Sequence, residues 1–277
     1  MTITRRAFLG TAAAGVCHAY AAPGLRIGVT DWNLRQTGRV EAVTLARQLG
    51  FDGVEVSLGR KPSGDRLPMA DESIQNAYLA AAGKEKIALA GTCLDILHVN
   101  YLKDDRLGQK WVADGIGITK KLNAKVMLLP FFGKGAIEAK TEQDYVGDVL
   151  RELAPEAAKS GVLLGLENTI SAEANARIMD RTRSEAVKVY YDVGNSTRAG
   201  FDPAREIPWL GRDRICQFHL KDNPHYLGQG AIDFPAIAKA IHLIAFRGFA
   251  NLETASPSSD VAADMRRNLS FVRQIFD

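Results

Sequence analysis

The chain has 277 residues, with 35 Lys and Arg against 32 Asp and Glu and a formal net charge of +3 at pH 7. This nearly neutral balance gives no support to a nucleic-acid partner, whose affinity would depend on neutralising many phosphates. Beyond the N-terminal residues, no apolar stretch approaches the length that a membrane-spanning helix needs.

The N-terminus has the features of a removable export signal. Arg5 and Arg6 precede a short, alanine-rich apolar run, and Ala19-Tyr20-Ala21 has the A-x-A form of a cleavage site. We therefore predict that residues 1–21 are removed, which lowers the net charge to +1. The twin arginines resemble a Tat signal, which would place the folded protein in a bacterial periplasm with no membrane attachment. The alternative is an ordinary basic N-terminus.

From residue 25 onward, short apolar runs typical of buried strands alternate with helix-like runs. The strand-like runs are Leu25–Thr30, Val54–Leu58, Ile87–Leu94, Lys125–Leu129, Val162–Glu167, Val189–Asp192, Ile215–His219 and Phe249–Glu253. The helix-like runs are about Val40–Leu49, Ser73–Ala82, Leu107–Leu122, Glu142–Ser160, Ala174–Arg181, Pro203–Leu210, Phe234–Ile244 and Asp260–Ile275.

Strict alternation of strands and helices predicts a parallel sheet, and eight such units close naturally into a (β/α)8 TIM barrel. We expect one domain spanning residues 25–277, since no linker or shift in composition marks a second one. An open, doubly wound sheet is the alternative, but no G-x-G-x-x-G turn follows the first strand.

Four consecutive strands end in side chains that can bind a metal: Glu167, Asp192, His219 and Glu253. In a parallel barrel these ends meet at one rim, where three carboxylates would repel one another unless a cation neutralised them. The mixed set of ligands suits one divalent ion: Mn, Mg or Co, with Zn possible. Each residue alone could also be an ordinary polar group at a strand end.

Three further residues are candidates for substrate binding. Trp32 follows the first strand and could stack on a substrate ring or simply pack. Glu55 lies within the second strand, where it could contact substrate or pair with a cation. Lys221 lies two residues after His219 on the same strand face, with a solvated loop lysine as the alternative.

The remaining histidines and cysteines have simpler expected roles. His98 and His225 lie in predicted loops and His242 in a helix, where surface positions are the default. Cys93 and Cys216 fall inside predicted strands, so we expect two buried thiols rather than a disulfide.

Several short motifs together resemble those of the xylose-isomerase-like TIM barrels, the sugar phosphate isomerase/epimerase group. They are Leu166-Glu167-Asn168, Tyr191-Asp192-Val193-Gly194-Asn195, Phe218-His219-Leu220-Lys221-Asp222, Leu227-Gly228-Gln229-Gly230 and Leu252-Glu253. The resemblance covers most of the mature chain and is densest from residue 162 onward.

The resemblance implies a metal bound by Glu167, Asp192, His219 and Glu253. The two glutamates would also act as acid and base, one removing the proton next to a carbonyl and the other returning a proton to an enediolate. One position departs from the pattern: many epimerases of this group carry a substrate-contacting histidine where this chain has Asn195. Asparagine can hydrogen-bond a hydroxyl group but cannot shuttle a proton at neutral pH.

The expected function is therefore a metal-dependent isomerase or epimerase of a small carbohydrate. Export favours a substrate without phosphate, such as a 3-keto-sugar. A 3-keto-glycoside lyase or hydrolase with the same metal site, and a non-catalytic carbohydrate-binding barrel, are the alternatives; a homo-oligomer is possible. An apurinic-site endonuclease is disfavoured. Its three-zinc cluster needs several histidines, and only His219 lies at a predicted strand end.

Overall fold

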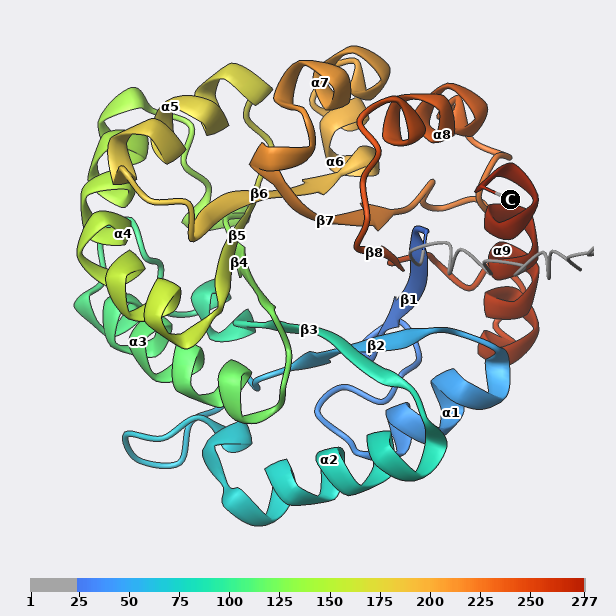
Figure 1. Ribbon diagram of the computed structural model, residues 1–277, viewed down its shortest axis with the longest axis horizontal. Helices are drawn as coiled ribbons and strands as arrows, with labels where there is room; N and C mark the ends of the chain where they lie inside the picture. Colours follow the sequence, from blue (N-terminus) through green and yellow to red (C-terminus); the bar gives the residue numbers. More distant parts are fainter. Residues whose placement is uncertain (1–23, 277) are drawn as a thin grey trace, which may run out of the picture.

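The computed structural model describes residues 24–276, so the predicted signal at 1–21 lies outside the described residues. Eight parallel strands close into one ring in chain order, with β1 hydrogen-bonded to both β2 and β8 (Figure 1). The strands are β1 (Arg26–Thr30), β2 (Gly53–Ser57), β3 (Ala88–Cys93), β4 (Val126–Pro130), β5 (Leu163–Glu167), β6 (Val187–Asp192), β7 (Ile215–Leu220) and β8 (Phe249–Leu252). The predicted single-domain (β/α)8 TIM barrel is confirmed.

The helices form an outer layer around this ring, as the view down the barrel shows (Figure 1). They are α1 (Glu41–Leu49), α2 (Glu72–Glu85), α3 (Arg106–Lys121), α4 (Lys140–Ser160), α5 (Ala172–Thr182), α6 (Val193–Arg198), α7 (Pro203–Leu210), α8 (Phe234–Leu243) and α9 (Val261–Phe276). Short 3-10 helices are η1 (Pro68–Ala70), η2 (Asp95–His98), η3 (Gly133–Gly135) and η4 (Arg212–Arg214). None of the helices within residues 24–276 is long and apolar enough to cross a membrane.

Local sequence signals explain where many helices begin and end. The Asp71 side chain accepts hydrogen bonds from the Ser73 and Ile74 amides at the start of α2, as capping aspartates do. Helices α1 and α4 end at Gly50 and Gly161, whose φ angles of 97° and 70° are readily adopted only by glycine.

The predicted strands and α-helices agree closely with the observed ones, apart from one α-helix; the four short 3-10 helices were not predicted either. The short helix α6 follows β6 without a loop and was not predicted. Most of the buried apolar side chains form one large cluster that includes residues of both the strands and the surrounding helices. Cys93 and Cys216 are free thiols buried in a second, smaller cluster, as predicted.

Several side chains on the inward face of the barrel are polar rather than apolar. Glu55, His219 and Asn251 are each 0% exposed. A buried polar group is costly unless it is hydrogen-bonded, so their partners define the interior beneath the candidate site.

Candidate active site

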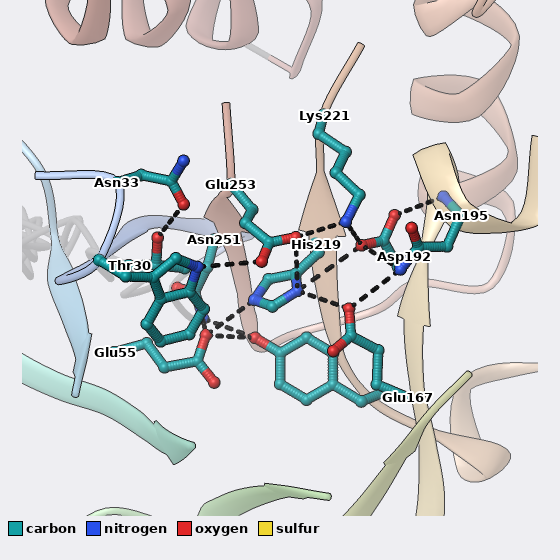
Figure 2. A network of polar contacts seen from close by, with 12 residues as sticks. Thr30, Asn33, Glu55, Glu167, Asp192, Asn195, His219, Lys221, Asn251 and Glu253 are labelled. Atoms are coloured by element: carbon teal, nitrogen blue, oxygen red, sulfur yellow. Dashed lines mark hydrogen bonds and ion pairs between the residues drawn. The ribbon is translucent and has the colours of Figure 1, made fainter. Parts of the chain in front are cut away.

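The four predicted metal ligands converge at the carboxyl ends of β5–β8. One ligand atom each from Glu167, Asp192, His219 and Glu253 lies within 4.8 Å of the others. His219 is fully buried at the centre of the group, and the three acidic side chains surround it (Figure 2). Barrel closure thus brings together four groups spread over 87 residues of sequence.

His219 presents its two ring nitrogens to two different environments. Nδ1 lies 3.0 Å from Glu167 Oε1, 3.5 Å from Glu253 Oε2 and 3.7 Å from an Asp192 oxygen. Nε2 lies 2.9 Å from Glu55 Oε2, on the other side of the ring. An imidazole that donates from Nε2 to a carboxylate keeps Nδ1 available as a ligand.

Glu55 belongs to a buried network beneath His219 rather than to the cavity wall. Its Oε2 atom also accepts hydrogen bonds from the Tyr190 hydroxyl at 2.8 Å and from Asn251 Nδ2 at 3.0 Å. Gly28 makes room for this network, because a Cβ there would lie 2.0 Å from Asn251 Oδ1. Glu55 thus lies behind His219 and does not line the cavity, so this geometry favours the second of its two predicted roles, pairing with a cation, over contact with substrate.

Asp192 is oriented by the helix that follows it. It is the N-cap of α6, where its Oδ1 accepts a 2.8 Å hydrogen bond from the backbone amide of Asn195. Its other oxygen, Oδ2, faces the cluster and accepts a 3.1 Å hydrogen bond from Asn195 Nδ2. The same nitrogen lies 3.4 Å from Glu167 Oε1, so Asn195 links two of the acidic groups.

Lys221 and Trp32 hold the remaining carboxylate. The Lys221 ammonium bridges Asp192 Oδ2 at 2.6 Å and Glu253 Oε2 at 2.5 Å, and Trp32 Nε1 donates to Glu253 Oε1 at 2.9 Å. Both residues line the same cavity as Glu253 and Asn195. The structure therefore places Lys221, Trp32 and Asn195, three of the candidate substrate-binding residues, beside the acidic cluster.

The charges in this cluster perturb one another strongly. Burial and the neighbouring carboxylates raise the pKa of Asp192. Burial also opposes ionisation of Glu253, but His219 and Lys221 outweigh it and lower the pKa of that carboxyl. Although burial disfavours the imidazolium, Glu253, Glu167 and Glu55 raise the pKa of His219 well above its ordinary value. Ionisation of Asp192 and Glu253 therefore depends on the positive charge that lies close to them.

The donor set fits a divalent metal ion. Three carboxylates and one imidazole nitrogen offer ligand atoms close to one another, and Glu55 supports the tautomer of His219 that a metal ligand needs. The carboxylates already bind the Lys221 ammonium and raise the pKa of His219, so the site favours positive charge.

A cavity of about 880 Å³ opens above the cluster. Its walls also include residues at or just after the carboxyl ends of β2–β4 that were not predicted as site residues: Ser57, Arg60, Asp95, His98 and Phe132. The expectation of a surface role for His98 is wrong, since this half-buried side chain stacks near Phe132 in the cavity wall.

The loop with Gly228 and Gly230 packs away from this cavity. The Gly230 amide donates to Asp222 Oδ2 at 2.7 Å, and a Cβ on Gly230 would lie 2.1 Å from Asp222 Oδ1. Gly228 has a φ of 76° against the ring of Phe271. These contacts explain both glycines as parts of a tight turn.

The fold and the site define a class of protein: a TIM barrel with a carboxylate and histidine centre at the carboxyl ends of its strands. The profile of the Xylose isomerase-like TIM barrel family matches residues 43–275. The chain belongs to this family.

Relatives and solved structures agree with this placement. A 2-epi-5-epi-valiolone 7-phosphate 2-epimerase of Actinoplanes sp. is 26% identical over 204 residues, which are 72% of this chain and 73% of that protein. A 3-keto-D-glucoside 4-epimerase of Escherichia coli superposes with a TM-score of 0.72 at 18% identity, covering 90% of this chain and 99% of the other. D-psicose 3-epimerase from Clostridium cellulolyticum gives a TM-score of 0.74 at 17% identity, with coverages of 91% and 100%.

Proposed function

We propose that this chain is a divalent-metal-dependent isomerase or epimerase that acts on a sugar or keto-sugar by removing a proton next to a carbonyl. The observation that carries this proposal is the pair Glu167 and Glu253. Glu167 is the last residue of β5 and Glu253 directly follows β8; both lie within 3.5 Å of His219 Nδ1, and both line one cavity. Two carboxylates that face a shared space can act as base and acid on the same substrate.

Glu167, Asp192, His219 and Glu253 would hold the metal ion, for which Mn, Mg or Co is favoured and Zn is possible. When bound, such an ion supplies positive charge that stabilises negative charge on the substrate oxygens. The chain's own residues would then move the protons. One glutamate removes the proton from the carbon next to the carbonyl, and the other returns a proton to the resulting enediolate on the neighbouring carbon or the opposite face.

The residues around the glutamates support these roles. Trp32 and Lys221 fix both oxygens of Glu253, which keeps the proton-accepting atom in place. Lys221 also has donors to offer a substrate oxygen. Asn195 lies at the cavity with its side-chain nitrogen toward Glu167 and Asp192, so it would position the carboxylates and a hydroxyl group rather than carry a proton.

Sugar chemistry is supported by the names of the three proteins compared above, which are epimerases of sugars or sugar-like compounds. The neighbour that acts on a 3-keto-D-glucoside supports a keto-sugar. It also keeps a 3-keto-glycoside lyase as a second candidate, because removal of the proton from the carbon next to the carbonyl can expel a leaving group from the adjacent β carbon.

The test is solvent deuterium exchange. Purified protein is loaded with Mn²⁺ and incubated in D₂O with a panel of keto-sugars, and NMR follows deuterium at the carbons next to the carbonyl. We expect exchange with the native protein and a loss of about 10²–10⁴-fold in Glu253→Gln, as for removal of an acid/base group. Glu185→Gln is the matched control, since that side chain is 98% exposed.

The outcomes separate the candidates. Exchange with inversion at one carbon identifies an epimerase, whereas release of a glycosidic group identifies a lyase. Binding without any exchange in the native protein would leave a carbohydrate-binding barrel and reject the proposed catalysis.

Export remains a proposal as well. It rests on Arg5, Arg6 and the Ala19-Tyr20-Ala21 site. N-terminal sequencing of protein recovered from the periplasm of an expressing bacterium should begin at Ala22; an intact Met1 in all of the protein would reject cleavage.

A further inference from the structure

The cavity is larger than the reacting part of the site requires. Its volume of about 880 Å³ is near the upper end of the range of roughly 300–1,000 Å³ that holds drug-sized ligands. The candidate catalytic residues come from β5–β8, yet most of the lining residues follow β1–β4. A single sugar ring at the glutamates would leave the β2–β4 side of the cavity unfilled.

That second side contains an aromatic wall. The rings of His98, in η2, and Phe132, after β4, lie with centroids 6.2 Å apart and planes at 22°. Both side chains are half-buried and line the cavity. Burial and the nearby Arg60 lower the pKa of His98, so its ring is neutral at pH 7. Neutral aromatic faces offer apolar contact area to the C–H face of a sugar ring.

A fixed polar pair lies on the same side. Asp95 is 5% exposed, and its two oxygens accept hydrogen bonds from the Gly59 amide at 3.0 Å and the Ser57 hydroxyl at 2.8 Å. Arg60 Nε lies 3.4 Å from Asp95 Oδ2 and is itself more than half exposed to the cavity mouth. The pair offers an oriented acceptor and a donor fork, which suits two neighbouring hydroxyl groups.

We propose that the substrate carries a second sugar ring, joined by a glycosidic bond to the ring that reacts at Glu167 and Glu253. The outer subsite, formed by Arg60, Asp95, His98 and Phe132, binds this second ring. The identity of the reacting ring rests on the proposed function. Binding of the second ring at the outer subsite does not depend on it. Its stacked aromatic pair and its buried, hydrogen-bonded carboxylate distinguish a sugar ring from a purely apolar group.

Equilibrium binding tests the outer subsite independently of turnover. Isothermal titration of the purified full-length protein compares 3-keto-D-glucose, a 3-keto-glucosyl-glucose disaccharide and phenyl 3-keto-glucoside. We expect the disaccharide to bind at least about tenfold more tightly than the monosaccharide, a difference of about 1.4 kcal/mol. Phe132→Ala and Asp95→Asn should each remove most of this difference. The control Trp209→Ala changes an exposed ring on α7, outside the cavity.

Equal Kd values for the monosaccharide and the disaccharide in the native protein would overturn the proposal. So would a preference for the phenyl glycoside over the disaccharide that Asp95→Asn does not change, since the outer ring would then not be a sugar. His98→Ala provides a second aromatic variant if Phe132→Ala fails to fold, as judged by its melting curve. The deuterium exchange described above is measured on the same samples, so loss of catalysis and loss of the outer subsite give separate results.

Discussion

The network behind His219 makes a quantitative prediction for Glu55→Gln. In the native protein, His219 Nε2, the Tyr190 hydroxyl and Asn251 Nδ2 all point at Glu55 Oε2, at 2.9, 2.8 and 3.0 Å. The carboxylate is fully buried, and its other oxygen has no hydrogen-bond partner among the described residues. Glutamine has nearly the same shape, so the variant removes the charge while filling the same space.

Two costs follow from this geometry. Loss of the carboxylate behind a ligand histidine typically weakens metal binding by about 10–100-fold, which is about 1.4–2.7 kcal/mol. In addition, the new amide nitrogen occupies the position of the unpartnered oxygen, and a buried donor without an acceptor costs about 1–3 kcal/mol of folding stability. We therefore expect weaker metal binding together with a lower melting temperature.

Manganese titration of the metal-free protein by calorimetry measures the first effect, and thermal unfolding measures the second. Tyr190→Phe is the matched variant, because it removes one donor to Glu55 and keeps the carboxylate and its charge. Its metal affinity should fall by less than about tenfold. A native metal affinity in Glu55→Gln would refute the assignment of Glu55 as the residue that positions His219, and absence of metal binding in the native protein would refute the metal site itself.

Three further changes give measurable results. Lys221→Met should strengthen manganese binding by roughly tenfold or more, because the ammonium no longer competes for the two carboxylates that it bridges; weaker binding in the same titration would contradict this. Burial raises the pKa of Asp31 from 3.8 to about 7, so between these pH values the native state holds a proton that the unfolded chain has lost. The free energy of unfolding therefore falls by at most ~4 kcal/mol as the pH rises from about 4 to 7. Asp31→Asn should flatten this pH dependence in denaturant titrations at pH 5 and 8, and an unchanged slope would reject it. Gly28→Ala should cost about 1–3 kcal/mol in the same titrations, since its Cβ would lie 2.0 Å from Asn251 Oδ1; native stability would show that the amide moves freely.

Much of the fold and the charged centre was predictable because each depends on local signals. A buried strand that ends in Glu167 or His219 can be recognised within a few residues, and eight such strands leave few topologies. Glu167 and Asp192 end their strands, His219 is the next to last residue of β7, and Glu253 directly follows β8. Convergence of these four groups then follows from barrel closure alone.

The remaining contacts depend on how distant segments meet. The Tyr190 hydroxyl reaches Glu55 across 135 residues and Trp32 reaches Glu253 across 221, and no local pattern specifies either direction. Helix α6 was missed because its six residues are too few for a helical period. The role of Asp192 as its N-cap could have been suspected from the Asp-x-x-Asn spacing.

The arrangement of these contacts separates catalysis from recognition in the barrel. His219 is fixed from below by Glu55, and the three acidic groups around it are held by Asn195, Lys221 and Trp32. The loops after β2–β4 provide the outer wall of the cavity but no member of the carboxylate cluster. Changes in those loops can therefore alter which substrate fits while leaving the charged centre intact. For this reason the binding and exchange experiments should respond to different sets of substitutions, and a single set that abolished both would show that the two halves of the cavity act as one.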